Sequence, residues 1–544
     1  MLDKTRLSRV LFNRHGRNCS TEVAADTSSA TCNNFRMITR RHVIKALGVG
    51  SAGLGLGSWA FGQVPATDRQ ALNIPALDGG TVAEQSRNFE LTLQRGSHSF
   101  LPGTSAQTLG INGNYLGPTL RFKRNERVRL QVNNSIGEAT TLHWHGFHLP
   151  PTEDGGPHQQ IAADQQWSPS FDVVQFAGTY WYHSHVMHNA GEQVYKGLAG
   201  MIIVDDEEQQ ASLPTTYGVD DIPLILQDRR FGDDGSLIYL NRYPDRVMGM
   251  LGDTMLVNGT VNPVFTPSTR FVRLRLLNAS NARTYNLGFS DDRQFYQVAS
   301  DGGYLDAPVP LTRLQLAVAE RAEILVEFDP SEEVTLVNIA LPPAFPDFPG
   351  AISEMMRTLN TQAFDILHFR AQAQLADNAE LPAQLNAIYR LPEAAATNTR
   401  GFRLSMGNGM RSGEDAGPGR GARNGRGGGF GGGQFAINGR LMSESYINES
   451  IEFNTTEIWE LTNTSPMMHP FHVHNGQFQI LDRDGSPPPA NEMGWKDTVR
   501  VGPSELVRIV MRFTDFRDEE NPYMYHCHIL EHEDRGMMGQ FVVV

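Results

Sequence analysis

Ten of the 17 histidines of this 544-residue chain are concentrated in four short clusters. On a β-strand, residues two positions apart face the same way, so a His-x-His motif presents two imidazoles on one side. Between His188 and His469 the chain has a single histidine, His368. We therefore expect the first and last parts of the chain to meet and form a joint metal site. The clusters are His143-Trp-His145, His183-Ser-His185, His469-Pro-Phe-His472-Val-His474 and His526-Cys-His528-Ile-Leu-Glu-His532.

Strand parity divides the last two clusters between two faces. Cys527 points away from the face that its neighbours His526 and His528 share. His469 lies three residues before His472, so its parity is also opposite. The sequence therefore predicts two sites rather than one. The first collects His469, Cys527 and His532, with Met537 nearby, and the second collects the eight remaining imidazoles.

The types of ligand residue at both sites favour copper. Two histidines, one thiolate and a weakly bound methionine are the ligands of a blue-copper electron-transfer centre. Neutral imidazoles also suit copper, whereas magnesium selects oxygen ligands and zinc does not require one cysteine beside ten histidines. Cys527 is peptide-bonded to His526 and His528. An electron that enters at the thiolate thus has a short covalent route to the second site.

Short runs of alternating apolar and polar residues predict β-strands throughout the chain after residue 62. Sustained helical periodicity is rare, and residues 375–390 are one modest candidate. The pattern predicts an all-β protein of repeated β-sandwich or barrel domains. Composition changes near residue 205 and over residues 372–400 predict three domains, at 63–205, 206–375 and 376–544. Representative strand runs are Phe89–Leu93, Arg127–Val132, Phe271–Leu276 and Leu506–Phe513.

Residues 401–434 differ from the rest of the chain. They contain 14 glycines and five arginines, together with Met406 and Met410. Such a composition cannot bury a core, which predicts a mobile insertion in the third domain. The insertion could cover a site, or it could be an exposed loop without a role, and both alternatives stay open.

The first 62 residues are typical of an export signal. Arg40 and Arg41 precede a weakly apolar, glycine-rich stretch that ends near Ala60, and this pattern resembles a bacterial twin-arginine (Tat) signal. A basic, glycine-rich disordered end is the alternative. Met37 would give a more compact signal than Met1, and the true start stays open. We expect cleavage near residue 62, export by the Tat machinery and a periplasmic or other extracytoplasmic location.

Charge and cysteine usage exclude several classes of protein. The net charge of −14 argues against nucleic acid as a partner. No apolar run reaches the roughly 18 residues of a membrane span. Cys19 and Cys32 would leave with the signal, so Cys527 cannot form an internal disulfide in the mature chain. It is either inert core or a metal ligand. We expect a monomer.

The four motifs, in this order and at the two ends of the mature chain, resemble those of the multicopper oxidases. The string His-Cys-His-x3-His-x4-Met at 526–537 is highly specific. Within the family, the chain is most similar to bacterial exported cuprous oxidases, spore-coat laccases and bilirubin oxidases. The resemblance implies three cupredoxin-like Greek-key domains. It also implies an enzyme that couples four one-electron oxidations of a donor to the reduction of O2 to water.

The resemblance further implies four copper ions. Motif matching gives type 1 copper to His469, Cys527, His532 and axial Met537; type 2 copper to His143 and His472; and the type 3 pair to His145, His183, His185, His474, His526 and His528.

Two acidic residues match the proton-relay acids of the family. Asp154 follows the first motif, and Glu533 directly follows His532. Each also has a plainer interpretation, since an aspartate before Gly-Gly is a good turn residue and a glutamate beside a ligand can simply orient it. We favour the relay role for both.

Three functions remain to be weighed. A copper-free scaffold is conceivable, because relatives of this fold that lost their ligands serve as envelope proteins, but here the ligand set is complete. A copper-storage protein would not need two connected sites. We therefore predict an oxidase that uses O2 and a small-molecule or Cu(I) electron donor.

The sequence constrains the chemical class of the electron donor less firmly. The cuprous oxidases carry a methionine-rich insertion and an acid four residues before the type 1 histidine. Here Ser465 takes that place, and the insertion retains only Met406 and Met410, although Met467 is kept. Arginines in the insertion would repel Cu(I). We favour laccase-type oxidation of phenols, other aromatics or bilirubin-like pigments, with cuprous oxidation in copper tolerance as the alternative.

Overall fold

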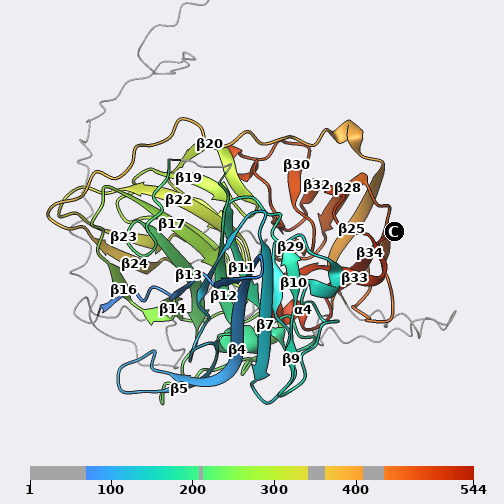
Figure 1. Ribbon diagram of the computed structural model, residues 1–544, viewed down its shortest axis with the longest axis horizontal. Helices are drawn as coiled ribbons and strands as arrows, with labels where there is room; N and C mark the ends of the chain where they lie inside the picture. Colours follow the sequence, from blue (N-terminus) through green and yellow to red (C-terminus); the bar gives the residue numbers. More distant parts are fainter. Residues whose placement is uncertain (1–68, 208–211, 341–361, 408–433) are drawn as a thin grey trace, which may run out of the picture. The chain divides into compact units, whose positions relative to one another are not determined.

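The computed structural model describes residues 69–207, 212–340, 362–407 and 434–544, which form a β-protein (Figure 1). The described strands assemble into six sheets. Each sheet takes nearly all its strands from one stretch of chain, so each has a narrow band of colour in Figure 1. The all-β prediction is confirmed. The predicted signal, residues 1–62, lies outside the described residues.

Residues 77–205 form two sheets around a shared core that includes Leu91, Trp144 and Tyr182. One sheet contains β3 (Thr81–Ala83), β4 (Ser86–His98), β5 (Ala106–Ile111), β7 (Arg127–Ser135), β9 (Gln166–Trp167) and β10 (Ser170–Asp172); the other contains β2 (Leu77–Asp78), β6 (Thr119–Lys123), β8 (His143–His145), β11 (Gly178–His183) and β12 (Ala199–Asp205).

The middle of the chain forms a second pair of sheets around a core that includes Leu274, Phe289 and Ile324. One sheet contains β13 (Asp221–Arg229), β14 (Thr254–Val257), β15 (Thr260–Val261), β17 (Phe271–Asn278), β19 (Phe295–Ser300), β20 (Gly303–Leu311) and β22 (Arg321–Glu327); the other contains β1 (Gln70–Ala71), β16 (Pro263–Phe265), β18 (Tyr285–Phe289), β21 (Leu314–Leu316), β23 (Glu333–Asn338) and β24 (Phe364–Arg370). Because β1 pairs with β16, the first strand in sequence lies in a sheet of the middle segment. The predicted domain boundaries stay predictions.

The last part of the chain forms a third pair of sheets, whose core includes Trp459, Phe471, Cys527 and Met537. One sheet contains β25 (Asn398–Gly407), β26 (Gln434–Ile437), β28 (Thr455–Asn463), β30 (Phe478–Arg483) and β32 (Leu506–Phe513); the other contains β27 (Glu449–Ile451), β29 (His469–Val473), β31 (Thr498–Val501), β33 (Asp518–Cys527) and β34 (Met538–Val543).

The helices of the described residues are short and connect strands. They are α1 (Ala190–Lys196), α2 (Tyr243–Met248) and α4 (Leu530–Glu533), with 3-10 turns η2 (Pro151–Glu153), η3 (Glu393–Ala395) and η4 (Ala490–Glu492). No described helix is long and apolar enough to cross a membrane.

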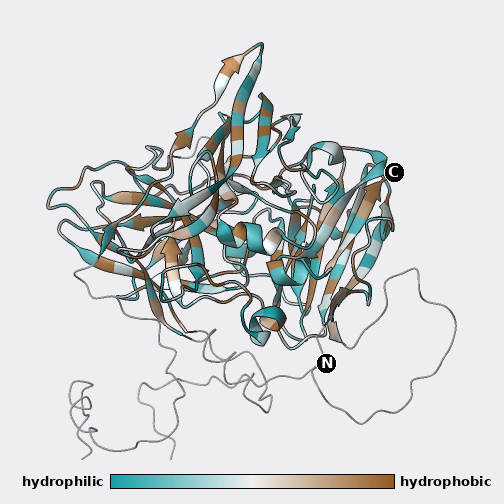
Figure 2. Cartoon of the chain, turned by 90° about the horizontal axis from the view of Figure 1, so that it is seen from below, coloured by the Kyte–Doolittle hydropathy of each residue, from teal (hydrophilic) through white to brown (hydrophobic). Residues whose placement is uncertain are grey.

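Side-chain alternation explains why these segments become strands. In β7, Val128, Leu130 and Val132 are buried while Arg127 and Arg129 face solvent. A pleated strand buries one face in this way, because successive side chains point to opposite sides. Figure 2 shows the result as alternating brown and teal bands along many strands.

Two expectations from the sequence are wrong in detail. Residues 375–390 form no helix: Pro382 interrupts the segment, and the backbone N–H groups of Ala376 and Leu385 donate to the carbonyls of Ser268 and Asp306. The glycine-rich insertion is also shorter than predicted. Its first residues complete β25 and Gln434 begins β26, so the interval between these strands is 408–433, which lies outside the described residues.

Candidate metal centres

Antiparallel strand pairing brings the histidines of the eight-imidazole cluster together. His143 of β8 lies opposite His183 of β11, and His472 of β29 lies opposite His526 of β33. Only the first motif lies wholly inside a strand, and the second histidine of each other His-x-His pair follows a strand end. The parity expectation therefore holds strictly only for β8. All eight side chains are buried: His143, His145, His183, His185, His472, His474, His526 and His528.

Rings from the first and last parts of the chain stack directly on one another. The ring centroids of His143 and His474 are 3.9 Å apart, and those of His145 and His472 are 3.7 Å apart. The prediction that these two parts of the chain meet is confirmed.

Most of the rings direct one nitrogen outward to an oxygen of the protein. Such contacts fix the tautomer and leave the other nitrogen as a lone-pair donor, as is typical of metal-bound histidines. The outward partners are the backbone oxygens of Asp154 for His143, Ser184 for His183, Asp497 for His472 and Cys527 for His526, and carboxylate oxygens of Asp497 for His145, Asp154 for His474 and Glu533 for His185.

The opposite nitrogens face each other inside the cluster. His526 Nε2 lies 3.1 Å from His185 Nε2 and 3.2 Å from His474 Nε2. Nε2 of His143 and of His472 is buried without a hydrogen-bond partner among the described residues. Two lone pairs at such a distance repel each other unless a cation lies between them. The arrangement therefore fits a group of metal ions.

Burial favours the neutral form of His143, His183, His185 and His474. It lowers the pKa of His183 to about 3 and that of His185 to about 4, and it lowers the pKa of His143 and His474 well below the usual value. Nearby imidazoles add to the effect for His143 and His474, because like charges disfavour the protonated form. Neutral imidazole is the form that binds copper.

Both predicted acids lie beside this cluster. His474 donates from Nδ1 to Asp154 Oδ2 at 2.7 Å, and burial raises the pKa of Asp154 well above its usual value. Glu533 Oε2 lies 3.2 Å from His526 Nδ1 and Oε1 lies 3.4 Å from His185 Nδ1. Burial opposes ionisation of Glu533, but these histidines outweigh it and bring its pKa to about 2. Burial thus favours the protonated form of Asp154, whereas the pKa of Glu533 favours its charged form.

The second centre brings together the predicted thiolate set. Cys527 Sγ lies 3.3 Å from His469 Nδ1 and 3.7 Å from His532 Nδ1, and all three side chains are fully buried. Phe435 stacks on the His532 ring at 3.6 Å. Met537 is buried in the same core, and its carbonyl accepts the Cys527 N–H.

The outer nitrogens of these two histidines are also engaged. His469 Nε2 is 2.7 Å from Ser465 Oγ, and His532 Nε2 donates to the Val247 carbonyl of α2 at 3.0 Å. Both rings therefore direct Nδ1 toward the sulfur. Two imidazoles and one sulfur in a dry pocket fit a blue-copper centre.

Two residues at these centres were not found from the sequence. Asp497 contacts His145 and His472, and Val247 contacts His532. Neither belongs to a histidine motif. Val247 contacts His532 through its backbone carbonyl, so its residue type does not indicate this role.

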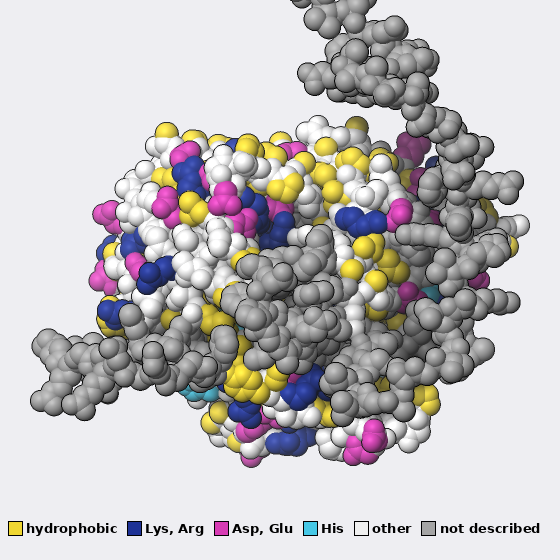
Figure 3. All heavy atoms as spheres, turned by 180° about the vertical axis from the view of Figure 1, so that it is seen from behind, with side chains coloured by type: hydrophobic (Ala, Val, Ile, Leu, Met, Phe, Trp, Pro, Cys, Tyr) yellow, Lys and Arg dark blue, Asp and Glu magenta, His cyan; other side chains and the backbone are white. Residues whose placement is uncertain are grey.

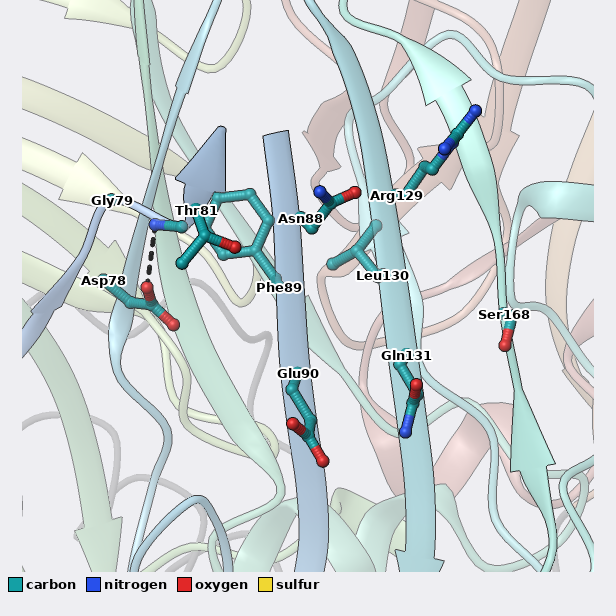
Figure 4. Close-up of a pocket in the computed structure, with 11 residues that line it drawn as sticks. Asp78, Gly79, Thr81, Asn88, Phe89, Glu90, Arg129, Leu130, Gln131 and Ser168 are labelled. Atoms are coloured by element: carbon teal, nitrogen blue, oxygen red, sulfur yellow. Dashed lines mark hydrogen bonds between the residues drawn. The ribbon is translucent and has the colours of Figure 1, made fainter. Parts of the chain in front are cut away.

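A polar hollow over β4 and β7 lies apart from both centres (Figure 4). Its lining includes Asp78, which accepts a hydrogen bond from the Gly80 N–H, together with Glu90 and Arg129. None of its lining residues contributes to the histidine clusters.

On the described surface visible in Figure 3, cationic and anionic side chains are interspersed rather than gathered by sign.

Two segments, residues 92–209 and 421–544, match family models described as multicopper oxidase. The multicopper oxidase mco of Staphylococcus haemolyticus is 33% identical over 463 residues, covering 84% of this chain and 88% of that protein. The chain belongs to the multicopper oxidase family. As a multicopper oxidase it is an oxidoreductase, and the family implies copper, O2 and an electron donor.

Other relatives of this multicopper oxidase carry different names. The solved structure of a laccase from Pediococcus acidilactici has a TM-score of 0.74 and 36% identity, covering 88% of this chain and 94% of that one. CueO from Ochrobactrum sp., a laccase-like enzyme with oxidase activity towards lignin model compounds and lignosulfonate, has a TM-score of 0.75 and 34% identity, covering 87% and 100%. The cell division protein FtsP of Xenorhabdus nematophila is 33% identical, covering 93% and 98%.

Proposed function

We propose that the protein is a four-copper oxidase that transfers electrons from an organic donor to O2 and forms water. The observation that carries this proposal is that two buried groups of possible metal ligands lie in the structure and are connected by the backbone of residues 526–528. The proposed ligands are His469, Cys527, His532 and Met537 for type 1 copper, His143 and His472 for type 2, and His145, His183, His185, His474, His526 and His528 for the type 3 pair.

When bound, copper would supply one-electron redox chemistry at the first centre and reduction of O2 at the second. The protein contributes the connection between the two, because Cys527 is bonded to His526 and His528. It also excludes water, since every imidazole of the cluster is buried. The donor would deliver its electrons near His532, whose outer nitrogen is covered by the Val247 carbonyl.

Asp154 and Glu533 are proposed to move the protons that water formation needs. Asp154 Oδ1 has no hydrogen-bond partner among the described residues, while Oδ2 accepts from His474. The carboxyl can therefore hold a proton at Oδ1 close to the cluster. Glu533, charged between His185 and His526, is placed to accept one.

We favour organic donors over Cu(I). Ser465 is buried and engaged with His469 and the Met467 carbonyl, and Met467 is packed in the core. Neither is exposed to receive a copper ion from outside. A laccase-like donor range is also consistent with the similarity to the Ochrobactrum CueO, which oxidises lignin model compounds. Cuprous oxidation remains the alternative.

We further propose that residues 1–62 direct export by the Tat machinery and that the mature enzyme acts outside the cytoplasm. Residues 63–205, 206–375 and 376–544 are the proposed domains, and the mature enzyme is proposed to be a monomer. Edman sequencing of the exported protein would test the cleavage site near residue 62.

The decisive experiment is to load the purified protein with copper, count the bound ions and record its visible spectrum. Four ions per chain and an intense blue band are expected. Oxygen uptake with a phenol, bilirubin and Cu(I), assayed side by side, would then rank the donors. A chain that binds no copper would contradict the proposal and favour a non-catalytic role like that suggested by the name of the FtsP relatives.

A further inference from the structure

An ion pair between two segments that are distant in sequence links the middle of the chain to the histidine cluster. Arg321 begins β22, and Asp497 precedes β31. The guanidinium contacts both carboxylate oxygens, with Arg321 Nη1 2.7 Å from Asp497 Oδ1. Neither side chain is exposed by more than 1%. Such a two-point contact fixes the orientation of a carboxylate more firmly than a single hydrogen bond.

Glu320 and Lys496, the residues that precede Arg321 and Asp497, form a second ion pair. Here the middle segment supplies the anion and the last segment the cation. Lys496 Nζ lies 3.1 Å from Glu320 Oε1 and 2.8 Å from Asp301 Oδ2. Consecutive residues Glu320-Arg321 therefore face consecutive residues Lys496-Asp497 with their charges matched. This fixes the register between the two segments.

Asp497 in turn contacts two rings of the cluster. His145 Nε2 donates to Asp497 Oδ1 at 3.1 Å, and His472 Nδ1 donates to the Asp497 carbonyl at 2.8 Å. Thr498 Oγ1 also donates to Asp497 Oδ1. One residue thus sets the orientation of a ring from the first part of the chain and of the ring stacked on it from the last part.

The backbone beside the first motif makes room for the ion pair. Gly146, which directly follows His145, has a φ of +89°. A Cβ at this position would lie 2.5 Å from Asp497 Oδ2 and 2.9 Å from Arg321 Nη2. Glycine is therefore required both by the left-handed backbone and by the close approach of the pair.

We propose that Arg321 and Asp497 are positioning residues that set His145 and His472 for copper in the eight-imidazole cluster. The middle segment, which supplies no histidine to the cluster, thereby determines its metal affinity through one arginine. Without Arg321 a charged carboxylate would be buried without its main partner, which is strongly unfavourable, so we expect Asp497 to hold the two rings less firmly. The inference rests on the proposed copper sites of the preceding section.

Arg321→Met tests this proposal against a purely structural role. The matched control is Arg273→Met. Arg273 of β17 is also buried and pairs with Glu323, which lies on β22 like Arg321, and none of its described contacts is with a histidine. Both variants lose a buried ion pair, so both should lower the unfolding midpoint of the copper-free protein. Only Arg321→Met should weaken copper binding at the cluster, by roughly 10–100-fold.

The readouts separate the two copper centres. Chelator competition gives the affinity of the cluster copper, electron paramagnetic resonance reports type 2 copper, and the blue band reports type 1 copper. We expect the type 2 signal of Arg321→Met to weaken while the blue band is retained. A normal type 2 signal and copper affinity in Arg321→Met, or an equal loss in Arg273→Met, would overturn the inference.

Two further variants keep the test informative if Arg321→Met does not fold. Arg321→Lys keeps the charge but loses the two-point contact, and it should show a smaller loss of the same kind. Gly146→Ala leaves both charges in place but pushes them apart, and it should weaken the type 2 signal. Unchanged affinity in both variants would overturn the inference. A wild-type chain without copper would instead overturn the proposed function.

Discussion

At the scale of single residues, Cys527 joins the two candidate copper centres. Its sulfur lies beside His469 and His532, while its two peptide neighbours belong to the other cluster. No other described cysteine exists to replace it. The side chain is wholly buried, so its role depends on its chemistry and not on its exposure.

Cys527→Ser should abolish both the blue band and the oxidation of donors. A serine hydroxyl cannot supply the soft thiolate that blue copper requires, and the change is nearly isosteric. The eight imidazoles are unchanged, so the cluster copper should still bind. Copper analysis and the visible spectrum check this: about three ions per chain and no blue colour are expected. A variant that stays blue would show that the thiolate assignment is wrong.

Asp154→Asn should slow the reduction of O2 by roughly 10²-fold, the size of a typical general-acid contribution, and leave reduction of the type 1 centre nearly unchanged. The amide oxygen can still accept from His474 Nδ1, but the side chain can no longer carry a proton. Stopped-flow kinetics would measure the two half-reactions separately.

Glu153→Gln is the matched control, because Glu153 is adjacent but accepts only from the Ser170 N–H among the described contacts. It should leave both half-reactions unchanged. Equal slowing of both half-reactions in Asp154→Asn, or loss of copper, would indicate that Asp154 is structural.

At the scale of elements, the hairpin of β25 and β26 determines how the His532 ring is covered. The strands are antiparallel, with Gly407 opposite Gln434 and Met406 opposite Phe435. Phe435 stacks on His532. A slip of one residue would turn Phe435 to the other face of the sheet.

Replacing residues 408–433 with Asn-Gly should therefore leave the protein folded and blue. Gly407 and Gln434 are already paired, and a two-residue turn joins such neighbours without changing the register. If the arginines of this interval recruit anionic donors, KM should rise for those donors and less for neutral phenols. Added salt should mimic that change in the intact protein by screening. Equal KM values for charged and neutral donors, before and after replacement, would show that residues 408–433 do not influence the choice of donor.

The elements also show what one sequence can and cannot reveal. Strand β32 has the bounds predicted for its alternating run, Leu506–Phe513, because alternation is local. The helix expected over residues 375–390 fails because backbone groups of that segment bond to distant partners such as Asp306.

The proposed metal ligands lie mostly in histidine motifs, because the residue types of such motifs indicate their chemistry. The contacts of Arg321 with Asp497 and of His532 with Val247 join residues 176 and 285 positions apart. Charge pairs and backbone contacts at such separations have no periodicity or motif. These contacts depend on how the sheets pack against one another, and no local pattern in the sequence indicates that packing.

At the scale of the whole molecule, the two copper centres should contribute differently to stability. The ligands of the cluster come from segments as distant as His185 and His526, 341 positions apart. His469 and Cys527, in the other centre, are 58 positions apart. A metal that binds both segments acts as a crosslink, and the entropy it removes from the unfolded chain grows with the logarithm of loop length.

Copper removal should therefore lower the unfolding midpoint, and most of that loss should come from the cluster. The ratio of the two loop lengths alone corresponds to about 1.5 kcal/mol in favour of the cluster, and the proposed function assigns three ions to the cluster and one to the other centre. Calorimetry of copper-loaded and copper-free forms of the wild type and of Cys527→Ser measures the difference. Because Cys527→Ser should lose only type 1 copper, it should keep more than half of the copper-dependent rise in the midpoint. A variant that loses nearly all of that rise would mean that the type 1 centre, not the cluster, holds the distant parts of the chain together.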